Sequence, residues 1–169
     1  SANSLEKEKS SIYEKNYSRR FIPFIRLGPE MTDLGNHNSI MPAFGFGFRS
    51  ESNISAVDCS FSYARSETKE GLEISHVIAP KLTYLKYINS HSPSAIFLGF
   101  GSAWASIRNE VTRQSFDGLA GVLSGGIEYG RDSRIRQIYQ IDIHQPVLGL
   151  KSERPSFMPI VEGSFSLGF

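Results

Sequence analysis

Hydrophobic and polar side chains alternate along most of this chain with a period of two. The clearest case is the last segment, residues 161–169, where Val, Phe and Leu alternate with Glu, Ser and Gly. Successive side chains of a strand point to opposite faces of its sheet, so this period predicts strands with one apolar face. The alternation recurs in the segments 43–49, 57–64, 96–105, 119–129 and 139–147. It is less regular in 21–27 and 78–88, and in the latter Leu85 and Tyr87 fall out of phase.

Seven clusters rich in turn-forming residues separate these segments. They are Gly28–Ser39, Ser50–Ser55, Arg65–Ser75, Asn89–Ser94, Arg108–Gln114, Gly130–Arg134 and Lys151–Pro159. The breaks leave eight segments of strand length, none with a helical period. Eight antiparallel strands joined in chain order close into an up-and-down barrel, which leaves no exposed sheet edge. We therefore predict an all-β, eight-stranded antiparallel barrel over residues 19–169, preceded by a polar tail over residues 1–18.

The volume of the side chains indicates which face of the barrel lies outside. An eight-stranded barrel encloses a lumen only wide enough for side chains to fill it. Bulky residues such as Phe44, Phe46 and Phe48 would overfill that space, whereas small ones such as Gly45 and Gly47 fit it. We therefore predict a transmembrane barrel with its apolar face outward and its polar and small residues in the lumen. A soluble lipocalin-like barrel that carries an apolar ligand is the alternative.

The composition narrows the class of protein further. With 40% hydrophobic residues, 21% charged residues and a net charge of +1, the chain is neither a disordered acidic segment nor a polybasic nucleic-acid binder. No apolar run approaches the roughly 18 residues of a membrane-spanning helix. The single cysteine, Cys59, excludes an internal disulfide framework and a Cys-rich zinc site. The first residues lack the apolar core of a signal peptide, so either the protein never had one or this is a mature, processed chain.

Over residues 19–169 the chain resembles, in architecture, the small eight-stranded bacterial outer-membrane proteins of the OmpA/OmpX type. The part of the sequence that carries this resemblance most specifically is the alternating C-terminal segment, which ends at Phe169. The resemblance implies that Phe165, Leu167 and Phe169 form the signal read by the barrel-assembly machinery. It also implies a monomer in the outer membrane of a Gram-negative bacterium, in contact with membrane lipids and lipopolysaccharide. The tail and the breaks Ser50–Ser55, Asn89–Ser94 and Gly130–Arg134 would then be periplasmic, and the other four breaks extracellular.

Charged residues on the predicted lumen face form the main candidate site. They are Arg26, Arg49, Asp58, Lys81, Glu128, Arg136, Asp142, His144 and Glu162. Buried charges are tolerated when they are paired, so we expect a compensating network in which Glu128 faces Arg136 and Arg49 faces Asp58. An ion or proton path through the lumen is the alternative. Acid–base chemistry at His144, Asp142 and Glu162 is a second alternative.

Aromatic residues at positions predicted to face outward would form girdles at the two membrane interfaces. They are Tyr63, Tyr84, Trp104, Tyr129 and Tyr139. We expect Cys59 to face lipid without a chemical role. Gly125 and Gly126 are expected inside, where strands pack closely. His76 and His91 are expected in loops on opposite sides of the membrane.

The predicted role is structural, in envelope integrity, or a surface contact made through the extracellular loops, with a filled lumen that is not an open pore. We predict no catalytic residue, no metal and no cofactor, and no nucleic-acid partner. The enzymatic alternative is a lipid A-modifying activity, because two families of outer-membrane barrels of this size act on lipid A with a His and a Ser near the outer leaflet. Here Asp33, His37 and Ser39 lie in the first predicted extracellular break, and their surroundings match neither family.

Overall fold

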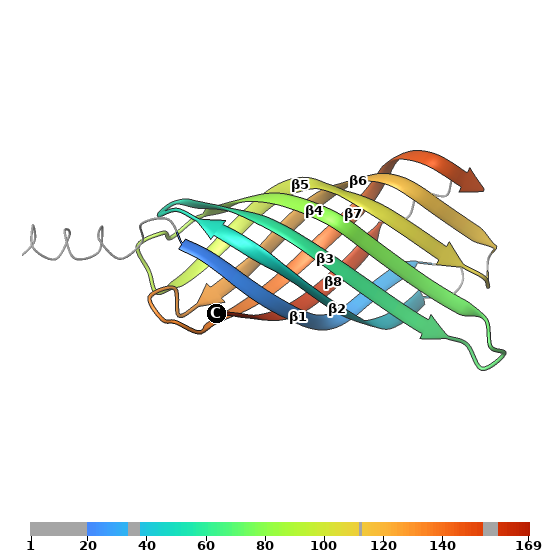
Figure 1. The fold of residues 1–169 in the computed structure, drawn as a ribbon, viewed down its shortest axis with the longest axis horizontal. Coiled ribbons are helices and arrows are strands. Elements are labelled where there is room, and N and C mark those ends of the chain that lie inside the picture. Colours follow the sequence, from blue (N-terminus) through green and yellow to red (C-terminus); the bar gives the residue numbers. More distant parts are fainter. Residues whose placement is uncertain (1–19, 34–37, 112, 154–158) are drawn as a thin grey trace, which may run out of the picture.

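A computed structural model describes residues 20–33, 38–111, 113–153 and 159–169. Eight antiparallel strands follow one another in chain order and close into a barrel through the pairing of β1 with β8 (Figure 1). The strands are β1 (Arg20–Asp33), β2 (Asn38–Glu51), β3 (Ser55–Glu67), β4 (Glu73–Tyr87), β5 (Ser94–Asn109), β6 (Gln114–Tyr129), β7 (Arg136–Glu153) and β8 (Ile160–Gly168). No helix within the described residues is long and apolar enough to cross a membrane. The predicted strand number and topology are confirmed.

The two ends of the barrel differ. One end, here called the turn end, carries the connections 52–54, 88–93 and 130–135, the start of β1 and the C-terminus (left in Figure 1). The opposite end, here called the loop end, carries the connection 68–72 between β3 and β4, the last residues of β1, β5 and β7, and the first residues of β2, β6 and β8. The predicted tail over residues 1–18 lies outside the described residues.

The strands at the loop end are longer than the turn-rich clusters predicted. Strands β1 and β2 extend to Asp33 and from Asn38, so most of the predicted break Gly28–Ser39 is paired sheet. Pro29 lies opposite Pro42 in this ladder, and both prolines are exposed on the outer face. Proline cannot donate a backbone hydrogen bond, but it is tolerated where the ladder is interrupted, and here the pairing of β1 with β8 skips Gly28 and Pro29 without a change of register. The connection between β1 and β2 therefore lies inside the predicted break, which was too wide at both ends.

The outer wall is apolar and the lumen is polar, as the volume argument predicted. Phe44, Phe46, Leu98, Phe100 and Leu123 all face outward and are more than half exposed. The alternate positions, including every charged position on the predicted lumen list, are buried inside the barrel. This arrangement is the reverse of a soluble barrel, and the predicted fold class with its apolar face outward is confirmed.

Strand β4 changes phase at an irregularity. Its register against β3 and β5 shifts around Ala79 and Pro80, so the buried positions change from even-numbered residues such as Ile78 to odd-numbered ones such as Lys81. After the shift Leu85 and Tyr87 point into the lumen. A β-bulge has this effect, because one extra residue reverses the face of all that follow. From Lys81 to Tyr87 the faces alternate without interruption, so the apparent break at Leu85 and Tyr87 reflects apolar side chains on the lumen face and not a second change of phase.

The lumen also contains large apolar side chains, which the simple division into bulky and small faces did not predict. Near the turn end, Leu85 and Tyr87 pack with Phe97 and Ile138 in a buried cluster. Nearer the loop end, Ile78, Phe116 and Val122 form a second cluster with small alanines. Apolar and charged side chains therefore fill the lumen together.

Glycines on the two faces have different reasons for their small size. A Cβ atom on the inward-facing Gly101 would lie 1.9 Å from the carbonyl oxygen of Leu82, so only glycine allows β5 to approach β4 this closely. Gly126 likewise points inward, against Tyr139 and Phe97. Its neighbour Gly125 lies on the outer face, where the nearest atom to a Cβ would be the end of the Leu98 side chain at 3.2 Å. The expectation that Gly125 lies inside is therefore wrong.

Candidate functional site: the ion pairs of the lumen

Near the turn end, Arg49 links two opposite walls of the barrel. It lies directly across from Asp58 in the β2–β3 ladder and donates to both carboxylate oxygens, with Nε–Oδ1 at 2.7 Å and Nη2–Oδ2 at 2.8 Å. Its Nη1 also donates to Glu128 Oε2 at 2.7 Å. Because β2 and β6 are four strands apart in a ring of eight, this second bond crosses the lumen.

Two further arginines extend the cluster toward the turn end. Arg136 Nη1 donates to Glu128 Oε1 at 2.7 Å and also to Glu51. Arg131, from the connection between β6 and β7, reaches back into the barrel to Glu51 and lies over the Tyr87 ring at 3.8 Å from its centroid. Three arginines therefore face three carboxylates, which leaves this buried layer formally neutral.

A second layer lies around Asp142 and Glu162, near the middle of the barrel. Asp142 accepts from Lys81 Nζ at 2.5 Å and from Arg26 Nη1 at 3.1 Å. Glu162 lies 3.5 Å from Arg26 Nη1 and 3.8 Å from Lys81 Nζ. Since Lys81 is on β4 and Glu162 on β8, this layer also joins opposite walls.

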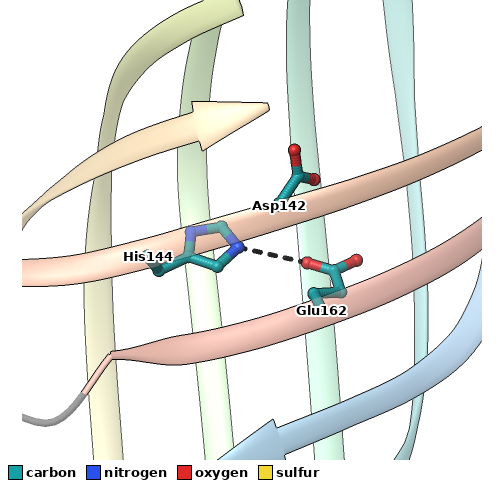
Figure 2. A group of neighbouring side chains, drawn as sticks. All are labelled: Asp142, His144 and Glu162. Carbon is teal, nitrogen blue, oxygen red and sulfur yellow. Dashed lines mark hydrogen bonds and ion pairs between the residues drawn. The ribbon is translucent and has the colours of Figure 1, made fainter. Parts of the chain in front are cut away.

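The group Asp142, His144 and Glu162 is the arrangement that most resembles a site for chemistry (Figure 2). One ligand atom from each residue lies within 4.8 Å of the others, and His144 Nε2 is 3.4 Å from Glu162 Oε2. Lys81 and Arg26 already neutralise both carboxylates, however, so a metal cation would have to displace two buried charges. These residues do not fit a metal centre.

The same group also lacks the geometry of nucleophilic catalysis. Ser62 Oγ donates to Glu162 at 3.3 Å, and Ser124 Oγ bonds to Asp142. Activation of a serine requires a hydrogen bond to the histidine base, whereas both of these serines bond to carboxylates. The arrangement is that of hydroxyls completing the hydrogen bonds of buried carboxylates.

A buried pair of Glu30 and His76 lies nearer the loop end. Both side chains are fully buried, and His76 Nδ1 bonds to Glu30 Oε1. The prediction that His76 lies in a loop is wrong, because β4 begins at Glu73 and His76 points into the lumen. Glu30 was missed for the same reason, since it falls within a stretch read as a turn.

The structure places all nine predicted lumen residues inside the barrel, each at most 2% exposed. It adds partners that the sequence analysis missed, namely Glu30, Glu51, His76, Tyr87, Arg131 and Gln140. Glu51 lies two residues after Arg49 and therefore faces the same side of the sheet. Extending the predicted alternating segment by two residues would have placed Glu51 in the lumen. Arg131 follows the end of β6, where alternation carries no information.

The predicted outer-wall residues are found on the outer face. Tyr84, Trp104, Tyr129 and Tyr139 are exposed, and Tyr63 is half-buried. Tyr84, Tyr129 and Tyr139 lie toward the turn end of their strands, and Tyr63 and Trp104 toward the loop end. The terminal residues Phe165, Leu167 and Phe169 also lie outside, half-buried or exposed, and Cys59 is half-buried.

The residues of the enzymatic alternative cannot be placed together. His37 lies outside the described residues, as do the side chains of Asp33 and Ser39.

Similar solved structures share the architecture of this chain. Neisserial surface protein A (NspA) superposes with a TM-score of 0.65 at 7% identity, covering 88% of this chain and 95% of that one. Ail, the attachment invasion locus protein of Yersinia pestis, gives 0.57 at 11% identity, covering 89% and 97%. The N-terminal β-barrel domain of Pseudomonas aeruginosa OprF gives 0.51 at 11% identity, covering 90% and 100%. No protein-family model matches the sequence, and no curated protein sequence is similar to it.

The fold is therefore that of the small, closed, eight-stranded barrels found in Gram-negative outer membranes. The predicted resemblance to this class is confirmed at the level of architecture.

Proposed function

We propose that this chain is an integral outer-membrane β-barrel, inserted by the barrel-assembly machinery as a monomer. The observation that supports the proposal is the distribution of its side chains. Phe46, Leu98 and Leu123 are about 60% exposed, whereas the charges are confined to the lumen. Such an outer surface is unfavourable in water, but it matches the hydrocarbon core of a bilayer.

We further propose that the barrel is closed to ions and has a non-enzymatic role. Arg49–Glu128 and Lys81–Glu162 each bridge strands four positions apart, and buried apolar clusters fill the lumen beside these bridges. Closed barrels of this kind support the envelope or present their loops to the exterior. NspA is described as a surface protein and Ail as an attachment and invasion protein, which favours surface contact through the loop end.

The membrane topology can be tested by cysteine labelling. In a Cys59→Ser background, Lys69→Cys places a thiol at the loop end, and His91→Cys places one at the turn end; both positions are exposed. With the protein exported in a Gram-negative host, a membrane-impermeant maleimide should label residue 69 on intact cells and residue 91 only after the outer membrane is permeabilised. Equal labelling at both positions on intact cells would contradict the proposal.

The structural and surface-contact roles can be separated with a loop variant. Shortening the connection 68–72 to a two-residue turn removes exposed residues such as Lys69 and Glu70 but leaves the barrel strands intact. A surface-contact role requires that adhesion of the cells falls while their resistance to detergents is unchanged. Loss of detergent resistance only in cells lacking the whole barrel, with adhesion never affected, would instead identify the structural role.

A further inference from the structure

The outer wall over β5–β8 contains an apolar trough. It has a volume of about 750 Å³ and lies around Ile141, with Leu98 and Leu123 on its rim. A second hollow of about 420 Å³ shares Ile127 and Tyr139 with it and continues to Tyr129 and Gln137. The trough therefore runs from the middle of the wall to the edge of the turn end.

Two outward-facing glycines, Gly125 and Gly163, form the floor of the trough. Gly125 lies opposite Ile141 in the β6–β7 ladder, and Ile141 lies opposite Gly163 in the β7–β8 ladder. A Cβ at Gly163 would meet nothing nearer than Pro29 Cγ at 3.7 Å. Close strand packing, which explains the inward glycine Gly101, does not explain these two. Their effect is to leave space on the outer face.

The length of the trough corresponds to one leaflet of a bilayer. From Leu123 to Tyr129 the chain advances six residues, which is about 20 Å along a strand at about 3.3 Å per residue. Barrel strands tilt by about 40°, so the trough spans about 15 Å along the membrane normal. That depth is half of the roughly 30 Å hydrocarbon core.

The polarity of the trough changes along this length. The middle is lined by aliphatic side chains, and the turn end by Tyr129 and Tyr139, whose rings lie 6.0 Å apart. The exposed Gln137 lies opposite Tyr129 in the β6–β7 ladder, and the exposed Arg134 follows in the connection 130–135 at the turn end. The sequence of aliphatic, amphipathic and then charged groups is the same as that from the acyl chain to the phosphate of a lipid.

From this geometry we infer that the trough is a binding site for one acyl chain of a phospholipid in the turn-end leaflet, with the phosphate near Gln137 and Arg134. The inference rests on the proposed membrane insertion. It adds that one lipid stays bound in the trough while the other lipids around the barrel exchange with the bilayer. A second copy of the chain would need a complementary apolar face, whereas the lining of the trough passes from aliphatic side chains to Tyr129 and Gln137, in the order of the groups of a lipid.

Retention of lipid can be measured by native mass spectrometry. The folded barrel is placed in nanodiscs of phosphatidylethanolamine and phosphatidylglycerol, transferred to detergent and weighed at a collision energy that removes the detergent. We expect the unaltered protein to retain one phospholipid. Gly125→Leu and Gly163→Leu fill the trough and should each lower the retained fraction at least tenfold.

Gly121→Leu is the matched control. Gly121 also faces outward on β6, in open space with its nearest neighbour at 3.7 Å, but it does not line the trough. It should retain lipid like the unaltered protein. A heat-dependent shift in SDS mobility verifies that each variant is folded. Gly163→Leu, whose Cβ has its nearest neighbour at 3.7 Å rather than 3.2 Å, carries the test if Gly125→Leu does not fold.

The outcomes separate the two proposals. A barrel that enters nanodiscs but retains no lipid, or retains it equally in all variants, overturns the trough and leaves membrane insertion standing. A dimer that survives removal of lipid and is lost in Gly125→Leu overturns the trough in favour of a second copy. A chain that never enters nanodiscs overturns both.

Discussion

Arg49 illustrates how a charge is tolerated in the interior of this barrel. Its guanidinium group donates to both oxygens of Asp58 and to Glu128, and it lies over the ring of Phe97 at 4.9 Å from the centroid. Planar, bidentate pairing of this kind satisfies several donors with fixed geometry, which lysine could not do. Removing a carboxylate from such a network leaves an uncompensated buried charge, which costs much more than the pair contributes when intact.

Replacement of Glu128 by alanine tests this at the residue scale. Glu128 joins Arg49 and Arg136, so Glu128→Ala leaves each arginine with one carboxylate fewer. We expect the free energy of unfolding to fall by about 3–5 kcal/mol, as for other broken buried pairs. Urea unfolding of the barrel in lipid vesicles measures the change.

The control is an ion pair at the surface. Arg65 and Glu73 lie 3.0 Å apart but are about half and two-fifths exposed. Breaking this pair with Glu73→Ala should cost only about 0–1 kcal/mol. Equal effects of the two substitutions would mean that the lumen is solvated rather than dry.

Within each strand, the alternation of side chains decides which face a residue lies on. A bulge reverses that face, and an inward glycine allows the neighbouring strand to approach closely. The irregularity at Ala79 and Pro80 turns the second half of β4, so that Lys81 reaches Asp142 and Lys86 faces outward near the turn end. Without that shift Lys81 would face the outer wall. Inward glycines such as Gly101 allow neighbouring strands to pack closely around the filled lumen.

The role of the inward glycines can be tested by adding one methyl group. In Gly101→Ala the new Cβ would overlap the backbone of β4 at Leu82, so the strands must move apart. We expect a loss of stability of about 1–3 kcal/mol, typical of overpacking, measured as the urea midpoint in vesicles. Gly121→Ala, where the space is open, should change stability by less than half as much; the reverse order would show that the assigned faces are wrong.

For the whole molecule, the arrangement of the two faces determines the environment it can occupy. Exposed aromatic and aliphatic side chains cover the outer wall, and the described lumen is occupied by ion pairs and apolar clusters. The hydrocarbon of a bilayer stabilises such a surface, and water does not.

A lysine scan of one strand tests the orientation of the wall. Phe46 and Ser50 both face outward on β2, Phe46 near the middle of the strand and Ser50 beside the turn end. Phe46→Lys should destabilise the barrel in vesicles by about 2–4 kcal/mol and Ser50→Lys by about 0–1 kcal/mol, because the cost of a charge falls toward the membrane interface. A greater cost at Ser50 would contradict the proposed orientation.

Conductance tests the closed lumen. Because Arg49–Glu128 and Lys81–Glu162 bridge opposite walls, the barrel reconstituted in a planar bilayer should pass no steady ion current. A filled eight-stranded barrel has no continuous water path along its axis. Stable single-channel steps from the pure protein would favour the ion-path alternative instead.

The sequence by itself determined the fold to the level of strand number, order and orientation. A period of two is a direct record of which side chains face the same way, and eight such segments bounded by turns have few ways to close. Charged residues such as Arg49 and Glu128 could be assigned to the lumen because each shares its phase with small neighbours. The pairs Arg49–Asp58 and Glu128–Arg136 could also be predicted from the sequence. Each joins two strands that are connected by one turn, so it depends only on the register beside that turn.

Only the tertiary structure decided which distant residues meet. Arg49 and Glu128 are 79 residues apart in the sequence, and Glu30 and His76 are 46 apart. Their contact depends on how far each strand is staggered around the barrel, a quantity that no single segment encodes. The bulge in β4 and the outward position of Gly125 likewise depend on the pairing of whole strands. Local alternation therefore determines the face of a residue, whereas the closure of the barrel determines its partner.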